Sequence, residues 1–338
     1  MRNKVQGMFL GVAIGDSLGM PVETWGRERI LQQYPNGIQR YETPDGHKWF
    51  AGEESGTVTD DTQLTLAVIK GIIQGNGFDL DAIAHQHVNA MSDSVAGWGK
   101  TTQETIRRLA NGVSWRESGK LESEGNRLYG VGNGVPMKIS PLAAWRVSTD
   151  EDLNCFDDKI VAFSAMTHYT QLSAHAALAH TYALIDCLVH TPKEYDIKGF
   201  FDTINIAFMS NVDYLKEGDS LKLRFQLLRN LWHEKGEDLS FEEIANTFKG
   251  TCYVADSLPY VYAHWLKNHK DVNVLYDSIN YGVDRNDTDS NASMLGAMLG
   301  ALHGVEIFEK EQHLIDGLKD YDEIMKWANL FCDNFGIG

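Results

Sequence analysis

Two stretches near opposite ends of the chain carry a small residue at every fourth position. These residues are Gly7, Gly11, Gly15 and Gly19 in the first stretch, and Ala292, Gly296, Gly300 and Gly304 in the second. In an α-helix, residues four apart lie on one face. Because each interior glycine costs a helix about 0.5–1 kcal/mol relative to alanine, close approach of another helix is the usual compensation. We therefore expect two buried helices that pack against each other and join both ends of the chain in one core.

Apolar residues at helical spacing dominate the rest of the chain. The segments with this pattern are 64–73, 82–91, 102–109, 160–166, 173–188, 200–208, 221–232, 241–248 and 257–266. No stretch shows the repeated alternation of polar and apolar residues that a large sheet requires. Residues 24–56 contain proline, Asn-Gly and Asp-Gly turn signals, which predict a long irregular surface segment. We expect an all-α fold, organised as a single domain over residues 1–338.

Composition and charge narrow the class of protein. Hydrophobic residues make up 43% and charged residues 23% of the chain, which is typical of a soluble globular protein. The formal net charge of −17 argues against nucleic acid or an anionic membrane surface as partner. The four cysteines lie far apart without a Cys-x-x-Cys pair, which indicates reduced thiols in a cytoplasmic protein. Residues 1–15 are only mildly apolar and are followed by Asp16, so we expect neither a signal peptide nor a membrane span there.

Two clusters of oxygen-bearing side chains each stand directly before an apolar helical run. The first cluster is Thr59, Asp60, Asp61 and Thr62, and the second is Asp287, Thr288, Asp289 and Ser290. Such residues cap helix N-termini well, so either cluster alone has a purely structural explanation. The helix dipole tolerates one or two carboxylates at each N-terminus. Four carboxylates in contact would repel each other strongly unless a cation lay between them.

The residue types in these clusters indicate which cation would bind. Hard divalent cations take about six oxygen ligands from carboxylates, hydroxyls and water. Such a set is supplied by Thr59, Asp60, Asp61, Asp287, Asp289 and Ser290. Because no paired Cys and His ligands accompany them, the set favours magnesium or manganese over zinc. It is large enough for two ions, about 3.5–4 Å apart as in two-metal sites.

Three further features give weaker signals. The segment 128–142 contains the run Gly-Val-Gly-Asn-Gly, whose backbone N–H groups could approach a phosphate, although a flexible turn is the simpler interpretation. Thr167 and His168 precede a predicted helix, where a lone histidine is more often structural. Asp16 follows Gly15 in the first glycine stretch and, taken alone, is best interpreted as a cap or a salt-bridge partner.

The order and spacing of these motifs resemble the ADP-ribosylglycohydrolase family. The motifs are GxxxGDxxGxPxE at 11–23, TDDT at 59–62, GNGxxMKxxPLA at 132–143, Thr-His at 167–168, and DTDS at 287–290 followed by the glycine-spaced run to 304. Known members have a compact all-α fold with a binuclear magnesium or manganese centre. They hydrolyse the bond between ribose C1 of ADP-ribose and an acceptor, often a protein arginine. The resemblance implies a metal-dependent hydrolase whose partner is an ADP-ribosylated protein or ADP-ribose.

The resemblance also implies roles for individual residues. The metal ligands would be Thr59, Asp60, Asp61, Asp287, Asp289 and Ser290, and the residues near the ADP-ribose would be Asn133, Gly134 and His168. Glu23 matches the acidic residue that contacts metal-bound water or the ribose. Asp60, Asp61 or Glu23 would accept the proton of the attacking water as general base.

Three positions depart from the pattern of the family. Ser290 stands where many members have Thr, Lys138 where many have Arg, and the pair 285–286 is Arg-Asn where Gly-Gly is usual. The last departure puts the local backbone shape in question. Because Ser in place of Thr also occurs in arginine-specific members, we expect N-glycosidic arginine as the preferred acceptor.

Two other functions are alternatives to the hydrolase. An immunity-type protein would neutralise a cognate ADP-ribosyltransferase toxin by binding it, and segments 24–56 and 111–135 are long enough for that purpose. This role is compatible with hydrolysis in the same protein. A lens-type structural protein of the same fold is disfavoured by the intact ligand set.

Overall fold

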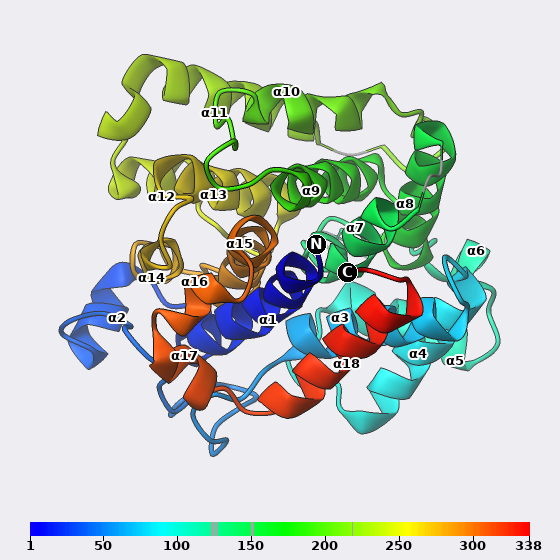
Figure 1. Ribbon diagram of the computed structural model, residues 1–338, viewed down its shortest axis with the longest axis horizontal. Helices are drawn as coiled ribbons and strands as arrows, with labels where there is room; N and C mark the ends of the chain where they lie inside the picture. The colour runs from blue at the N-terminus through cyan, green and yellow to red at the C-terminus, as the bar shows by residue number, and fades with distance from the viewer. Residues whose placement is uncertain (123–124, 126–127, 150–151, 218) are drawn as a thin grey trace.

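Helices form almost all of the regular structure of this protein (Figure 1). The computed structural model describes residues 1–122, 125, 128–149, 152–217 and 219–338. Within these ranges no β-strand is present, and extended pairing is limited to two isolated bridges, Gly132 with Tyr253 and Thr170 with Lys216. The predicted all-α fold is confirmed.

The helices of the described residues are joined by segments of unequal length, of which the one between α2 and α3 is long. In chain order they are α1 (Arg2–Gly19), α2 (Arg27–Gln33), α3 (Asp60–Gln74), α4 (Leu80–Asp93), α5 (Lys100–Ala110), α6 (Trp115–Ser118), α7 (Ser140–Val147), α8 (Leu153–Thr167), α9 (Gln171–Val189), α10 (Phe200–Asn205), α11 (Leu221–Lys235), α12 (Phe241–Phe248), α13 (Val254–Lys267), α14 (Asn273–Asn280), α15 (Thr288–His303), α16 (Glu306–Glu309), α17 (Gln312–Asp316) and α18 (Tyr321–Asn334). Short 3₁₀ turns at Met20–Val22 and Pro136–Lys138 border the candidate site described below.

The helices α1 and α15 lie side by side and antiparallel near the centre of the molecule (Figure 1). A Cβ atom on Gly11 would lie 2.0 Å from the carbonyl oxygen of Gly296, and a Cβ atom on Gly300 would lie 1.9 Å from that of Gly7. Backbone therefore meets backbone along this interface, and no side chain fits between the two helices. The predicted packing of two glycine-faced helices is confirmed.

The C-terminal helix α18, which the sequence patterns did not predict, closes this core. It packs against α1 and α3. The N–H group of Arg2 donates to the carbonyl oxygen of Gly338 at 2.8 Å, and the Arg2 guanidinium contacts the carboxylate of Asp333 at 2.6 Å. The two ends of the chain therefore lie close together, as the labels N and C show in Figure 1.

Capping side chains explain where several helices begin. Asp79, Thr170 and Ser220 accept hydrogen bonds from the first turns of α4, α9 and α11. The predicted helices lie inside observed ones except for 200–208, which divides into α10 and the 3₁₀ turn Ile206–Met209. The prediction of an irregular segment over 24–56 is wrong at its start, because α2 occupies part of it.

Two helical segments are long and apolar enough to cross a membrane. These are Arg2–Val22 and Gln171–Val189, whose apolar windows are 94% and 78% buried in the structure. Core helices that are mostly buried share this length and composition. Burial against the rest of the protein accounts for the apolar character of both segments.

Candidate active site

The antiparallel pairing of the glycine helices brings the C-terminal end of α1 to the N-terminal end of α15. A Cβ atom on Gly19 would lie 2.3 Å from the carbonyl oxygen of Thr288, and the Thr288 hydroxyl donates to the Gly19 carbonyl at 2.7 Å. Asp289, in the first turn of α15, and Glu23, which follows the 3₁₀ turn after α1, are thereby neighbours. The glycine spacing thus determines where these two carboxylates meet.

Asp16 connects the N-terminus of α3 to α1. Its buried carboxylate accepts hydrogen bonds from the backbone N–H groups of Thr59 (2.9 Å) and Thr62 (3.1 Å), and from the hydroxyls of the same residues (2.7 and 2.5 Å). Thr59 is the N-cap residue of α3 but makes no cap bond with its own side chain. Asp16 therefore supplies the cap from another helix. The interpretation of Asp16 as a cap is confirmed.

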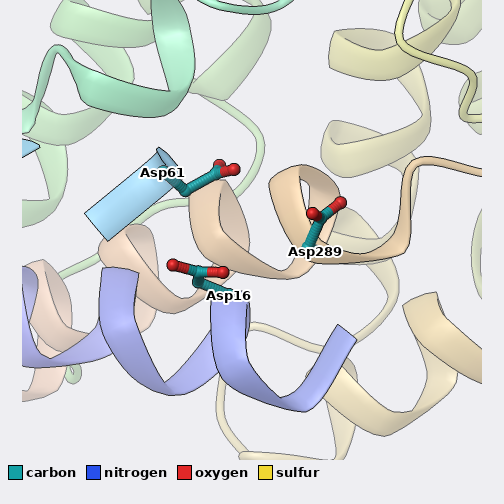
Figure 2. Close-up of side chains that lie close together, drawn as sticks. All are labelled: Asp16, Asp61 and Asp289. Atoms are coloured by element: carbon teal, nitrogen blue, oxygen red, sulfur yellow. The ribbon is translucent and has the colours of Figure 1, made fainter. Parts of the chain in front are cut away.

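Five carboxylates form two overlapping groups at the start of α15, which we call the acidic cluster. The first group is Asp16, Asp61 and Asp289, and the second is Glu23, Asp287 and Asp289. Within each group, one oxygen atom per residue lies within 4.8 Å of the others, and Asp289 belongs to both groups. Figure 2 shows the first group coming together from α1, α3 and α15.

The oxygen atoms of the acidic cluster fit a hard divalent cation. Oδ1 of Asp61 is buried and has no hydrogen-bond partner among the described residues, whereas Oδ2 accepts a hydrogen bond from Ser290 Oγ at 3.1 Å. A buried carboxylate without full compensation is costly unless a cation neutralises it. The available ligand atoms are oxygens, the type that magnesium and manganese prefer. The cluster is therefore chemically suited to such an ion.

Burial raises the pKa of the carboxyl groups around this site. For Asp60, Asp61 and Asp289 the pKa lies well above its usual range, because neighbouring carboxylates add to the effect of burial. Burial, together with the charge of Glu23, raises the pKa of Asp287 to about 6, although a 2.6 Å hydrogen bond from Asn133 opposes the rise. Without a cation, these carboxyl groups therefore retain protons to a higher pH than carboxyl groups exposed to water do.

The six predicted metal ligands lie near one another in the structure but differ in their contacts. Asp61, Asp287 and Asp289 belong to the acidic cluster, Asp60 and Ser290 line the adjoining cavity, and Thr59 donates its hydroxyl to Asp16. Asp60 faces the turn at Gly97, where a Cβ atom would lie 2.8 Å from its Oδ1. Their roles as metal ligands stay a prediction.

A cavity of about 450 Å³ adjoins the acidic cluster. Its acidic wall is formed by Glu23, Asp60, Asp287 and Asp289. The other walls come from residues 97–102, 128–129, 131–134 and 252–253, together with Trp49, Met137, His168 and Ser290. The volume is in the range of small-molecule sites, and the carboxylates lie at one side of it.

Asn133 and Gly134, predicted to bind substrate, line this cavity. The Asn133 side chain donates to Asp287 Oδ2 at 2.6 Å, so its amide orients a carboxylate of the cluster. A Cβ atom on Gly134 would lie 3.2 Å from both His168 and Thr102, which leaves little room for a side chain. The glycine keeps this part of the cavity wall open to a ligand.

The glycine-rich loop offers fewer free backbone donors than its sequence predicts. The N–H group of Gly130 donates to the Thr101 hydroxyl at 3.2 Å, and the N–H group of Asn133 donates to the Cys252 carbonyl at 3.0 Å. These bonds join the loop to the start of α5 and to the residues before α13. At these two positions the loop serves to build the cavity.

His168 and Lys138 are buried beside the cavity. Burial and the nearby charge of Lys138 lower the pKa of His168 to about 3, and its Nδ1 lies 2.9 Å from the Thr167 hydroxyl. His168 is therefore neutral at physiological pH. Burial lowers the pKa of Lys138 to about 7, which the charge of Asp60 opposes, and Lys138 Nζ has no hydrogen-bond partner among the described residues.

Several cavity residues were missed by the sequence analysis. Residues 97–102 form the turn and the start of α5, whose N-cap residue Gly99 makes no side-chain cap bond. Trp49 and Tyr253 reach the cavity from irregular segments. The two glycines before α5, without a capping side chain, were a usable signal, but nothing in the local sequence marked Trp49 or Tyr253.

At the pair Arg285-Asn286, which stands where Gly-Gly is usual in the family, the backbone adopts a conformation that glycine favours. Arg285 has a φ of 69°, in the left-handed region that few residues other than glycine adopt. Its N–H group donates to the Thr24 carbonyl at 2.9 Å, and the Thr24 N–H donates to the Asn286 carbonyl at 2.8 Å. This pair of bonds joins Thr24 to residues 285–286 beside the acidic cluster.

Comparisons with known proteins extend over nearly the whole chain. A sequence model of the ADP-ribosylglycohydrolase family matches residues 1–336. An ADP-ribosyl-(dinitrogen reductase) glycohydrolase of Rhodospirillum rubrum is 26% identical over 309 residues, which cover 90% of this chain and 87% of that protein. The ADP-ribosylhydrolase ARH3 of Mus musculus is 21% identical, over 95% of this chain and 89% of its own.

A solved structure shows the same fold. It is described as an ADP-ribosylglycohydrolase-related protein complex and aligns with a TM-score of 0.67 at 19% identity. The alignment covers 99% of this chain and 98% of that one. Because the family match spans residues 1–336, this chain belongs to the ADP-ribosylglycohydrolase family.

Proposed function

We propose that this chain is a metal-dependent hydrolase that releases ADP-ribose from modified arginine side chains. Membership of the family supports the hydrolysis of ADP-ribose linkages. The metal and the acceptor are inferred from the site. The observation that carries the proposal is the pair of carboxylate groups that share Asp289 beside the cavity.

The cofactors proposed are two ions of magnesium or manganese. Asp289 would contribute to both sites, with Asp61 on one side and Asp287 on the other, and Thr59, Asp60 and Ser290 would add oxygen ligands. When bound, such ions hold the ribose hydroxyls and lower the pKa of a water near C1. The buried, unpaired Oδ1 of Asp61 supports this assignment.

Glu23 and Asp60 are the proposed proton acceptors. Both line the cavity, whereas Asp61 is only 1% exposed and its Oδ2 is already hydrogen-bonded to Ser290. Positive charge develops on the ribose during glycosidic cleavage, and neighbouring carboxylates stabilise it. The same acidic wall would therefore position the water and stabilise the transition state.

Different residues of the cavity lining suit the two ends of the substrate. The pyrophosphate is anionic and needs donors in a protein with a net charge of −17. The uncapped N-terminus of α5, with Lys100, supplies them. A guanidinium acceptor suits Glu23 and Trp49, because a cation is attracted both to a carboxylate and to an indole face.

The proposal is tested by incubating the protein with arginine-, serine- and nucleic-acid-linked ADP-ribose. Each substrate is supplied with magnesium, with manganese, or after metal stripping with a chelator. We expect free ADP-ribose from the arginine linkage, only with metal present. The Asp289→Asn variant should lose this activity, whereas Asp322→Asn, an exposed position on α18, should retain it.

Two results would contradict parts of this proposal separately. Full activity after metal stripping would remove the metal ions from the mechanism. Faster release from serine than from arginine would overturn the acceptor while leaving the hydrolase intact.

A further inference from the structure

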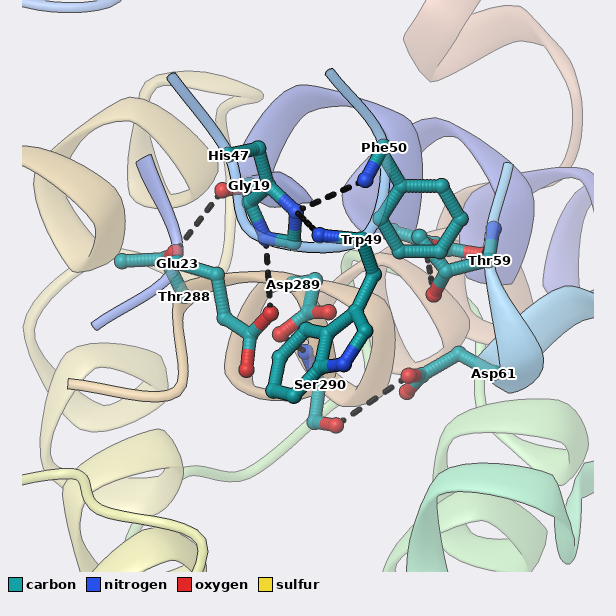
Figure 3. A network of polar contacts seen from close by, with 11 residues as sticks. Gly19, Glu23, His47, Trp49, Phe50, Thr59, Asp61, Thr288, Asp289 and Ser290 are labelled. Carbon is teal, nitrogen blue, oxygen red and sulfur yellow. Dashed lines mark hydrogen bonds and ion pairs between the residues drawn. The ribbon is translucent and has the colours of Figure 1, made fainter. Parts of the chain in front are cut away.

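His47 lies in the segment between α2 and α3 and contacts the edge of the acidic cluster (Figure 3). Its side chain is 3% exposed, and its Nε2 lies 2.9 Å from Oε2 of Glu23. Glu23 is one of the three residues in the second carboxylate group, with Asp287 and Asp289. A buried histidine from an irregular segment therefore contacts the most exposed member of that group.

The backbone around His47 determines which ring nitrogen carries the hydrogen. The N–H groups of Trp49 and Phe50 both point to His47 Nδ1, each at 3.2 Å, so Nδ1 acts as an acceptor. The ring hydrogen then lies on Nε2, and Nε2 donates to Glu23. The direction of the Glu23 contact is thus set by the fold of residues 47–50.

The same three residues reach two other parts of the cavity. Phe50 is buried, and a Cβ atom on Gly97 would lie 3.2 Å from its ring. Trp49 lines the cavity and is 48% exposed, and Figure 3 shows its indole beside Glu23 and Asp289. His47 therefore contacts both Glu23, a carboxylate of the cluster, and the backbone of Trp49, which lines the cavity.

We propose that His47 is a positioning residue, which holds the Glu23 carboxylate within the second carboxylate group and fixes Trp49 at the cavity. This inference rests on the proposed function. Glu23 needs such a partner because it has a flexible side chain and faces the like charges of Asp287 and Asp289. Without a donor on its other side, repulsion would turn its carboxylate toward solvent. Glu23 belongs to a carboxylate group that could hold a metal ion, and loss of an outer partner of a metal site typically costs about 10–100-fold in metal affinity or activity.

The alternative is that His47 only stabilises the segment that carries it. A double-mutant cycle separates the two roles, because residues that act through one contact show non-additive effects. The variants are His47→Phe, Glu23→Gln and the double variant. His47→Phe keeps an aromatic ring but removes both the Nε2 donor to Glu23 and the Nδ1 acceptor, while His47→Gln restores a donor and an acceptor. His85→Phe, at an exposed position on α4, is the matched control.

The first readout is the affinity for manganese, measured by titration calorimetry on each folded variant. We expect His47→Phe to weaken binding by about 10–100-fold. The double variant should bind no more than about twofold more weakly than Glu23→Gln alone, and His47→Gln should recover at least part of the loss. His85→Phe should bind like wild type.

The second readout is the kcat and KM of ADP-ribose release. A positioning role lowers kcat/KM in His47→Phe and restores it at least in part in His47→Gln, and the loss is again not additive with that of Glu23→Gln. Manganese affinity within twofold of wild type in both His47 variants, or losses that multiply in the double variant, would overturn the proposal. If no variant, wild type included, releases ADP-ribose, the proposed function fails, and the calorimetric cycle still decides the role of His47.

Discussion

The glycine interface and the cavity beside it are built from opposite kinds of contact. Along the interface, α1 and α15 touch backbone to backbone, and the residues that face each other are small and uncharged. At the cavity end of the same two helices, five carboxylates, an unpaired lysine and an unpaired carboxylate oxygen are buried or nearly so. The glycine interface stabilises the folded state, whereas the buried charged groups at the cavity destabilise it.

This difference shows where stability and function are separated in the molecule. A rigid helix pair can hold like charges together because its packing does not depend on them. Buried groups without partners persist in native proteins mainly where they serve a ligand or a reaction. We therefore expect substitutions in the interface to lower stability, and substitutions of the charged groups at the cavity to raise it or leave it unchanged while changing binding.

The largest expected effect on stability is that of Gly300→Leu. A Cβ atom there would meet the backbone of Gly7 at 1.9 Å, and backbone cannot move aside as a side chain can. Overpacking typically costs about 1–3 kcal/mol, occasionally more, and we expect at least 3 kcal/mol here. Gly199→Leu is the control, because the nearest atom to a Cβ atom at that position lies at 3.5 Å. Equal melting temperatures of Gly300→Leu and wild type would mean that the interface is not close-packed.

Lys138→Met should stabilise the protein. Burial lowers the pKa of Lys138 from 10.5 to about 7, so between these values the unfolded chain binds a proton that the folded protein does not. Below pH 7 the cost of burying the charged lysine therefore lowers wild-type stability in full, and this cost disappears as the pH rises toward 10. We expect a gain of about 2–4 kcal/mol at pH 6 in urea denaturation, and a smaller gain at pH 9.

Comparing Lys138→Met with wild type isolates the effect of the lysine, because both proteins have the same carboxyl groups. The pKa values of those carboxyl groups are raised, so they change the pH dependence of stability in the opposite direction. Lys326→Met, at an exposed lysine on α18, should show no such pH-dependent gain. A pH-independent difference, or a loss of stability in Lys138→Met, would show that Lys138 has a compensating partner.

Manganese binding should strengthen as the pH rises from 6 to 8. Burial raises the pKa of Asp287 to about 6, and burial with neighbouring carboxylates raises the pKa of Asp60, Asp61 and Asp289 well above the usual range, so a binding cation must displace protons. For each proton displaced, the affinity should rise about tenfold per pH unit. Titration calorimetry in buffers of different ionisation enthalpy measures both the affinity and the protons released. An affinity that does not change over this range would place the ions away from the acidic cluster.

The smallest expected effect on stability is that of Trp49→Ala. Trp49 is 48% exposed, and we expect its loss to change the free energy of unfolding by less than about 0.5 kcal/mol. The affinity for ADP-ribosylated arginine should nevertheless fall, because the indole lines the cavity. Trp98→Ala is the contrasting control, since Trp98 is 3% exposed and its removal should lower the melting temperature clearly. Unchanged substrate affinity in Trp49→Ala would remove Trp49 from the site.

The parts of the site carried by helices were predictable from the sequence. Asp61 and Asp289 each stand in the first turn of an apolar helix, and the glycine spacing requires α1 and α15 to pack closely. This pairing brings the carboxylates at the adjoining ends of α1 and α15 together, whereas the contact of Asp61 with them depends on how α3 packs. Asp16 could be interpreted as a cap, but not as a member of the acidic cluster, because its partners Thr59 and Thr62 come from a third helix.

The parts carried by irregular segments were not predictable. His47 and Trp49 lie in a segment without periodicity, so no spacing indicates which side chains point inward. Asn133 was expected to contact substrate, yet its amide holds Asp287, a contact that depends on the position of α15. Helix α18 was not predicted, although its buried residues Ile324, Ala328 and Phe331 recur at helical spacing.

Asp289→Asn tests most directly whether the carboxylates at the N-termini of α3 and α15 come together to bind metal. Two unit charges 4 Å apart repel by about 4 kcal/mol at an effective dielectric near 20, before proton uptake relieves them. In chelator the variant should therefore be at least as stable as wild type. With excess manganese the order should reverse, because ligation stabilises the wild type by mass action. Melting curves of both proteins under the two conditions should cross in this way. A variant that is less stable than wild type in chelator as well would show that Asp289 only caps α15, and would contradict the metal site.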